Sequence, residues 1–213
     1  MTAPTAHSTR RPSHGRFAVF ALAALCSGLI GCGFVMSVAP VVPESDAVPL
    51  PGLVGTWYAT DGSRATVTAR GGREYDIATV DSDGTPGEFR ARAGHLGDRL
   101  VLDVWSNPPG DVENTLISGH VLLFLELEGD DLREASFDAD SLANALRTRA
   151  LRTPFVEPES TMSKNLPILT APTHSLRAAL ASYMQRPGAV EEPNLLRRRS
   201  AAVDSTGSPP HRK

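Results

Sequence analysis

The sequence predicts a mostly β domain of the α+β type: an antiparallel meander with two packed helices in its C-terminal half. Three observations predict this class. Short segments between residues 53 and 135 alternate apolar and polar side chains, the two-residue period of a half-buried strand. Glycine-containing dipeptides separate these segments at the spacing of tight hairpins. After residue 138, two segments instead place apolar residues three and four positions apart, as on one face of a helix.

Alternating segments carry the predicted sheet. Their apolar faces are formed by Ala65, Val67 and Ala69; Tyr75 and Ile77; Phe89, Ala91 and Ala93; Leu100, Leu102 and Val104; and Val121, Leu123, Leu125 and Leu127. Turns are predicted at Asp61-Gly62, Gly71-Gly72, Asp83-Gly84, Gly97-Asp98 and Gly129-Asp130. Closely spaced hairpins favour an antiparallel sheet that twists and curls.

Two helices follow the meander. Asp138 or Asp140 is expected to cap the first, which runs to about Thr148. Thr173 is expected to cap the second, which Pro187-Gly188 terminates. The inward-facing residues are Leu142 and Leu146 in the first helix, and Leu176, Ala179, Leu180, Tyr183 and Met184 in the second. Short strands are also predicted at residues 155–156 and 168–170.

Composition divides the chain into four parts. Residues 1–31 read as a signal peptide, and residues 32–52 as a proline-rich tether. Residues 53–200 form the single folded domain. Residues 201–213 lack an apolar pattern and are expected to be a disordered tail.

The N-terminal part has the form of an export signal. Three arginines and no acidic residue precede an apolar run from Phe17 to Ile30. The run ends in Leu29-Ile30-Gly31-Cys32, which resembles the lipobox of bacterial lipoproteins. The resemblance implies cleavage before Cys32, a lipid on its thiol, and attachment to a membrane of the cell envelope. Because Gly33 stands where an Asp would signal inner-membrane retention, it also favours the outer membrane.

Two other interpretations of this segment remain open. Residues 17–42 carry no charged side chain, so the segment could stay in the membrane as a signal anchor. Its apolar run is shorter than the ~20 residues of a spanning helix. Alternatively, Cys32 could be an ordinary apolar residue in a conventional signal.

The start of the domain, Leu53-Val54-Gly55-Thr56-Trp57, carries a Gly-x-Trp on its first strand. This resembles the opening of lipocalin-like barrels, so such a barrel is one form that the meander can take. The resemblance implies that Gly55 and Trp57 form the barrel base and that an arginine from a late strand lies across the Trp57 ring. Arg197, Arg198 and Arg199 are the candidates, of which we select Arg198. The alternative is that Trp57 is an ordinary core aromatic.

Composition and motifs argue against several classes of function. A net charge of −3 gives no indication of nucleic-acid binding. Both cysteines, Cys26 and Cys32, precede the domain, so no cysteine-based metal site is expected in it. His95, His120 and His174 stand alone, without the spacing of metal ligands. No nucleophile motif or phosphate-binding loop is present. The sequence therefore predicts no catalytic residue, metal site or cofactor.

We therefore expect a lipid-anchored envelope lipoprotein with a non-enzymatic binding or structural role toward another envelope protein. One alternative is a lipocalin-like carrier of a small apolar ligand. Another is an envelope hydrolase, for which His95 or His120 near a carboxylate would be the place to look. A barrel lumen of several hundred Å³, the size of typical ligand pockets, would favour the carrier, and a filled core would favour the binding module.

Overall fold

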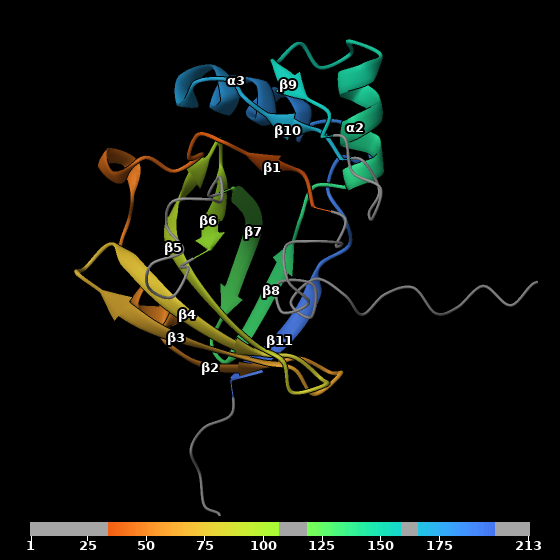
Figure 1. Cartoon of the computed structure of the whole chain (residues 1–213). Helices are drawn as coiled ribbons and strands as arrows, with labels where there is room; N and C mark the ends of the chain where they lie inside the picture. Colours follow the sequence, from red (N-terminus) through yellow and green to blue (C-terminus); the bar gives the residue numbers. More distant parts are fainter. Residues whose placement is uncertain (1–33, 107–118, 159–165, 199–213) are drawn as a thin grey trace, which may run out of the picture.

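The computed structural model describes residues 34–106, 119–158 and 166–198, and its centre is a closed barrel of eight antiparallel strands (Figure 1). The barrel strands are β2 (Gly55–Tyr58), β3 (Arg64–Arg70), β4 (Glu74–Val80), β5 (Pro86–Leu96), β6 (Arg99–Ser106), β7 (His120–Glu128), β8 (Asp131–Ala135) and β11 (Asn194–Arg198). Strands β2 to β8 pair in sequence order, and β11 pairs with both β8 and β2, which closes the barrel. The predicted meander is confirmed, and it closes.

Most of the residues predicted to face inward are buried, and Leu100 and Leu127 are partly buried. In β3, Ala65 and Val67 are buried as expected, whereas Ala69 is exposed at the end of the strand. The glycines of the predicted hairpin turns adopt positive φ, for example Gly84 at 90° and Gly129 at 62°. A side chain at such a position would be strained, which is why glycine occupies these turns.

Both predicted helices are present. Helix α2 (Ala139–Arg147) is capped by Asp138, whose side chain accepts the N–H of Ser141 at 2.7 Å. Helix α3 (Thr173–Tyr183) corrects the predicted cap, because Pro172 stands at the cap position and Thr173 is the first helical residue. The Thr173 hydroxyl instead donates to the carbonyl of Pro40 at 2.9 Å, so it joins the helix to the N-terminal part of the chain.

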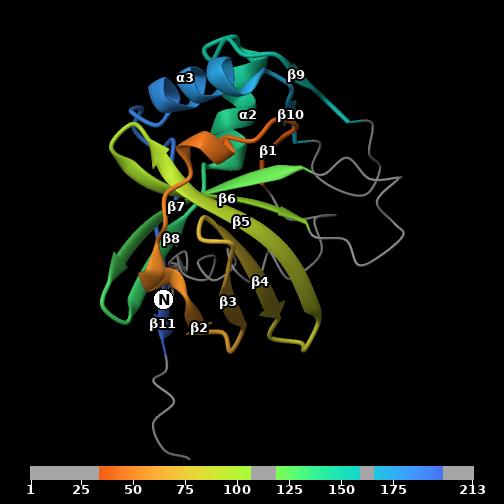
Figure 2. The same ribbon diagram turned by 90° about the vertical axis from the view of Figure 1, so that its left-hand side faces the viewer.

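Three two-residue strands lie beside the barrel. Strand β1 (Met36–Ser37) pairs antiparallel with the start of β7 and parallel with β10 (Ile168–Leu169), and β10 pairs with β9 (Phe155–Val156). Figures 1 and 2 both show β1, β9, β10 and the two helices at one end of the molecule, with β2 and β11 at the other. The short strands predicted at 155–156 and 168–170 are confirmed.

The molecule has two apolar cores, one on each side of the barrel wall. The lumen is filled by inward-facing residues such as Trp57, Phe89 and Leu123. The second core lies between the outside of the wall and the helices, and contains Leu122 and Phe124 of β7. Because β7 is buried on both faces, its sequence is a continuous apolar run instead of a simple alternation.

Residues 34–52 depart from the predicted tether and pack against the barrel; we call them the N-terminal strap. The strap includes two short 3₁₀ turns, Glu44–Asp46 and Pro51–Leu53. Val41 and Val42 are 2% and 0% exposed in the second core. The backbone N–H of Val48 donates to the carbonyl of Ala93 at 2.8 Å. The prolines keep the strap extended, and the barrel supplies partners for its backbone groups.

Two predicted segments lie outside the described residues. These are residues 1–33, with the signal peptide and Cys32, and residues 199–213, with the tail. In the ranges that are described, no helix is long and apolar enough to cross a membrane.

Candidate functional site

The base of the barrel brings together the residues that the sequence singled out. Trp57 is 1% exposed, and its indole N–H donates to the carbonyl of Leu53 at 2.8 Å. Arg198 is the register partner of Trp57 across β11 and β2. Its guanidinium carbon lies 4.6 Å from the centroid of the Trp57 ring, and its Nη2 donates to the carbonyl of Gly52. The arginine therefore joins the last barrel strand to the first by stacking and by a hydrogen bond.

Gly55 makes room for this arrangement. Its φ of 143° lies in a region that L side chains rarely adopt, and a Cβ there would lie 3.4 Å from Nε of Arg198. Glycine at this position thus satisfies both the backbone conformation and the close approach of the arginine.

The barrel lumen is nearly filled. The space that remains has a volume of about 30 Å³, and Trp57, Phe89 and Leu123 are among the residues that line it. Pockets for small ligands usually have volumes of about 300–1,000 Å³, so this space holds roughly one water molecule.

The ionisable residue Glu134 faces the lumen. It is 2% exposed, it lines the 30 Å³ cavity, and its Oε1 has no hydrogen-bond partner among the described residues. Burial raises its pKa to about 8, because the apolar surroundings disfavour the charged carboxylate. No sequence motif singles out Glu134 as a lumen residue. The pattern that indicates its position is the alternation in β8, which places Glu134 on the same face as the buried Leu132.

A larger space lies on the outside of the barrel, over β6, β7 and β8; we call it the outer groove. Its volume is about 450 Å³, and it is lined by residues that include Arg99, Phe124, Arg133 and Glu191. The guanidinium of Arg99 lies 5.4 Å from the Phe124 ring centroid. The groove combines an aromatic floor with charges of both signs, which suits polar groups of a partner better than a purely apolar molecule.

Glu191 is an exposed residue at the edge of the groove. Its Oε2 accepts the hydroxyl of Ser136 at 2.8 Å. Burial raises the pKa of Glu191, the hydrogen bond from Ser136 opposes this rise, and the nearby Asp138 adds to it. The residue is therefore tied to the start of the segment that leads from β8 into α2.

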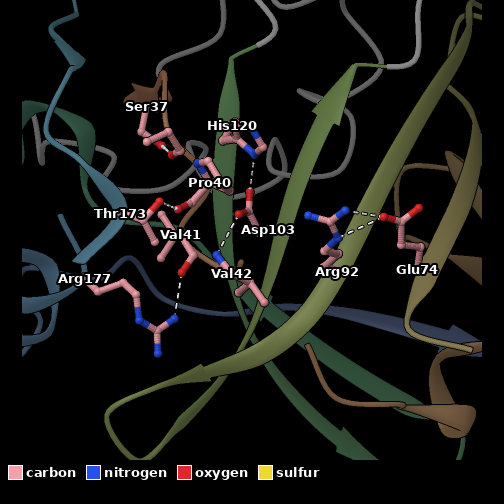
Figure 3. A network of polar contacts seen from close by, with 11 residues as sticks. Ser37, Pro40, Val41, Val42, Glu74, Arg92, Asp103, His120, Thr173 and Arg177 are labelled. Atoms are coloured by element: carbon pink, nitrogen blue, oxygen red, sulfur yellow. Dashed lines mark hydrogen bonds and ion pairs between the residues drawn. The ribbon is translucent and has the colours of Figure 1, made fainter. Parts of the chain in front are cut away.

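A polar network, shown in Figure 3, joins the strap to the barrel and to α3. Asp103 is fully buried on β6, where its Oδ2 accepts the N–H of Val42 at 2.8 Å and its Oδ1 lies 2.8 Å from Nδ1 of His120. On the other side of the strap, Nη1 of Arg177 donates to the carbonyl of Val41 at 2.7 Å. Two elements far apart in the chain therefore hold the strap from both sides.

The Asp103–His120 pair is the acid–histidine arrangement that a hydrolase would need. Ser37 is the register partner of His120 across β1 and β7, and it carries a hydroxyl group. The Ser37 hydroxyl donates to the carbonyl of Ala39 at 2.8 Å, so its proton is directed to the strap backbone. The other carboxylate oxygen of Asp103 accepts the backbone N–H of Val42, so the Asp103–His120 pair holds the strap in this conformation. Neither the lumen cavity nor the outer groove is lined by His120.

Beyond these sites, the described residues contain no group of three or more His, Cys, Asp or Glu side chains that could hold a metal ion. The lipobox residues Leu29, Ile30, Gly31 and Cys32 lie outside the described ranges. Comparisons with protein-family models, curated proteins and solved structures found no match to the chain.

Proposed function

We propose that this protein is a lipid-anchored lipoprotein of the bacterial cell envelope whose barrel is a non-enzymatic binding module for another envelope protein. The observation that supports the binding role best is the contrast between two spaces. The lumen leaves about 30 Å³, whereas the outer groove offers about 450 Å³ open to a partner. Recognition would therefore occur on the outside of the barrel.

The anchoring part of the proposal depends on Leu29-Ile30-Gly31-Cys32. A lipid on Cys32 would hold the mature chain at the membrane by its first residue, and several acyl chains make such attachment effectively permanent. The outer membrane remains the preferred location because Gly33, not Asp, follows the cysteine.

The second candidate function is a lipocalin-like carrier of a small apolar ligand. The Gly55, Trp57 and Arg198 arrangement supports a lipocalin-like barrel, which is the architecture a carrier would use. The lumen volume weighs against the carrier, because a small apolar ligand would have to displace several of the side chains that now fill the barrel.

Metabolic labelling tests the anchor. In a bacterial host grown with a clickable fatty-acid analogue, the wild-type protein should incorporate label and Cys32→Ala should not. Cys26→Ala is the matched control and should label like the wild type, because Leu25 before it is not a small residue. Equal labelling of wild type and Cys32→Ala, or no labelling of either, would refute the anchor.

Site-specific crosslinking tests the binding role. A photo-reactive residue in place of Pro193, an exposed residue of the outer groove, should capture one defined envelope protein in cells. The same residue in place of Arg73, exposed in the β3–β4 turn, should not. Adding Arg99→Glu should reduce the Pro193 crosslink, because it reverses a charge in the groove. Identical crosslinks from both positions would refute the outer groove as the recognition site.

A further inference from the structure

We propose that the exposed surface of the small β1–β10–β9 sheet, around Ile168, Val156 and the adjoining Val38, lies against the lipid bilayer. This inference rests on the proposed anchoring at Cys32. It adds an orientation: one defined face of the domain contacts the membrane, and the barrel is not free to tumble on a tether.

The first support is the reach of the chain. Cys32 precedes Phe34, the first described residue, by two positions, and two residues span at most about 7 Å. From Phe34 onward the strap is part of the folded body, with Val41 and Val42 in the core. A lipid on Cys32 therefore brings the surface around β1 to the level of the lipid headgroups.

The second support is where apolar side chains are exposed. Among the described residues, the large hydrophobic side chains that are most exposed are Val38, Val54 and Val156, at 45%, 37% and 51%. Two of these three belong to the small sheet: Val156 is in β9, and Val38 follows β1 and donates its N–H to the carbonyl of Leu169. Exposed apolar surface thus gathers beside the anchor instead of being spread over the barrel.

The register of the small sheet explains which face is exposed. Met36, Ile168 and Val156 are paired in one row across the three strands, so they share one face. The alternate row consists of Ser37, Leu169 and Phe155, and its apolar members, Leu169 and Phe155, pack into or against the core beneath the helices. In the first row, Met36 packs against the lumen core at the barrel side, Ile168 is half-buried and Val156 is 51% exposed, so the exposed part of this face lies around Val156.

The chemistry of the surface fits a bilayer. The three strands contain no charged side chain, and Glu157, which directly follows Val156, is neutralised by an ion pair with Arg147 at 2.6 Å. The aliphatic valines and isoleucine present hydrocarbon without directional groups, which suits the disordered boundary between acyl chains and headgroups. In both Figure 1 and Figure 2, these strands lie at one end of the molecule and leave the opposite end of the barrel remote from them.

Spin labels measure this orientation directly. Full-length protein carrying Val156→Cys is produced in a lipidating host, labelled with a nitroxide and reconstituted into vesicles of phosphatidylethanolamine and phosphatidylglycerol. Val38→Cys is a second reporter on the same surface. Glu128→Cys is the matched control, because Glu128 is exposed at the far end of β7. Strand β1 pairs with β7 at His120, eight residues from Glu128, so the control position lies about 27 Å away along the strand. The readout is the collision rate with oxygen, which concentrates in lipid, relative to that with a water-soluble nickel chelate.

We expect this ratio to rise severalfold at positions 156 and 38 in vesicles, relative to the same labels in an unlipidated chain that begins at residue 33 and keeps every described residue, with no change at position 128. Mass spectrometry of the N-terminal peptide establishes lipidation in the same samples. A lipidated protein whose label at 156 remains as water-accessible as the label at 128 would overturn the membrane-facing surface but leave the anchor intact. A label at 156 that is already shielded in the unlipidated chain from residue 33 would point to a second protein molecule on this face and also overturn the proposal. Absence of lipid on Cys32 would refute the anchor, and the orientation with it.

Discussion

Arg198, at the end of the last barrel strand, stacks over Trp57 of the first, with its guanidinium carbon 4.6 Å from the ring centroid. The pair lies where β11 and β2 close the barrel. The same guanidinium donates to the carbonyl of Gly52 in the strap. One side chain therefore connects the barrel closure, the base and the N-terminal segment.

Replacing this arginine should weaken the closure. We expect Arg198→Ala to lower the free energy of unfolding by about 1–3 kcal/mol, because it removes the stacking and the hydrogen bond to Gly52. The neighbouring Arg197 is the control: its side chain is 71% exposed, and its ion pair with Asp131 spans 3.5 Å. Arg197→Ala should cost less than about 0.5 kcal/mol. Chemical denaturation measures both, and equal losses would show that Arg198 has no special role.

Glu134 should make the stability of the barrel depend on pH. Its pKa is about 8 in the folded protein, above the usual 4.5 that applies to the unfolded chain. The folded state therefore holds the proton more tightly. The stability from the neutral, buried carboxyl is fully present below the unfolded pKa, and it is lost as pH rises through the folded pKa. Between the unfolded and the folded pKa, the free energy of unfolding falls by on the order of 1.4 kcal/mol per pH unit.

Glu134→Gln should remove this slope, because the amide has nearly the same shape and does not ionise. Urea unfolding at about pH 5 and about pH 9 is the measurement, with Glu128→Gln at an exposed position as the control. The variant should gain stability relative to wild type at the higher pH. An unchanged pH dependence would mean that Glu134 is not buried in its neutral form.

The strap should depend on Asp103. Asp103→Ala leaves the buried N–H of Val42 without its acceptor, at a cost of about 1–3 kcal/mol. We expect faster amide hydrogen exchange in peptides covering residues 38–50. His120→Ala, which leaves the Asp103–Val42 bond in place, should affect these amides less. If the two substitutions loosen the strap equally, the imidazole is as important as the carboxylate.

The filled lumen predicts an unliganded protein. The chain from residue 33 onward, which keeps every described residue, should have the mass of the chain alone when it is purified without detergent and measured by native mass spectrometry. A co-purifying apolar molecule removed by organic extraction would instead favour the carrier, and it would require the cavity of about 30 Å³ to expand on binding.

The sheet could be read from the sequence because each strand is marked locally, by alternation within it and by glycine turns at its ends. The Gly-x-Trp motif is local, whereas the contact of Arg198 with Trp57 is an expectation from the resemblance to lipocalin-like barrels, because no local pattern links residues so far apart in the chain. The packing of the strap against the barrel could not be predicted from such local patterns. Val41 and Val42 are adjacent yet both buried, because one side of the strap meets the barrel and the other meets α3. Their hydrogen-bond partners lie 136 and 61 residues away, respectively.

Single positions also escaped prediction for physical reasons. Thr173 has the residue type of a helix cap, but its hydroxyl bonds Pro40, a tertiary contact without any local signal. Glu134 looks like a surface residue by type, and only its place in the alternation of β8 indicates the lumen. The outer groove collects residues from several separate segments of the chain, so no short stretch of sequence marks it.

The most direct test of the lipid anchor is the mass of the N-terminal peptide of the mature protein isolated from bacterial membranes. The account predicts a peptide that begins at Cys32 and carries acyl chains. A peptide that begins elsewhere, or that begins at Cys32 with an unmodified thiol, would contradict it.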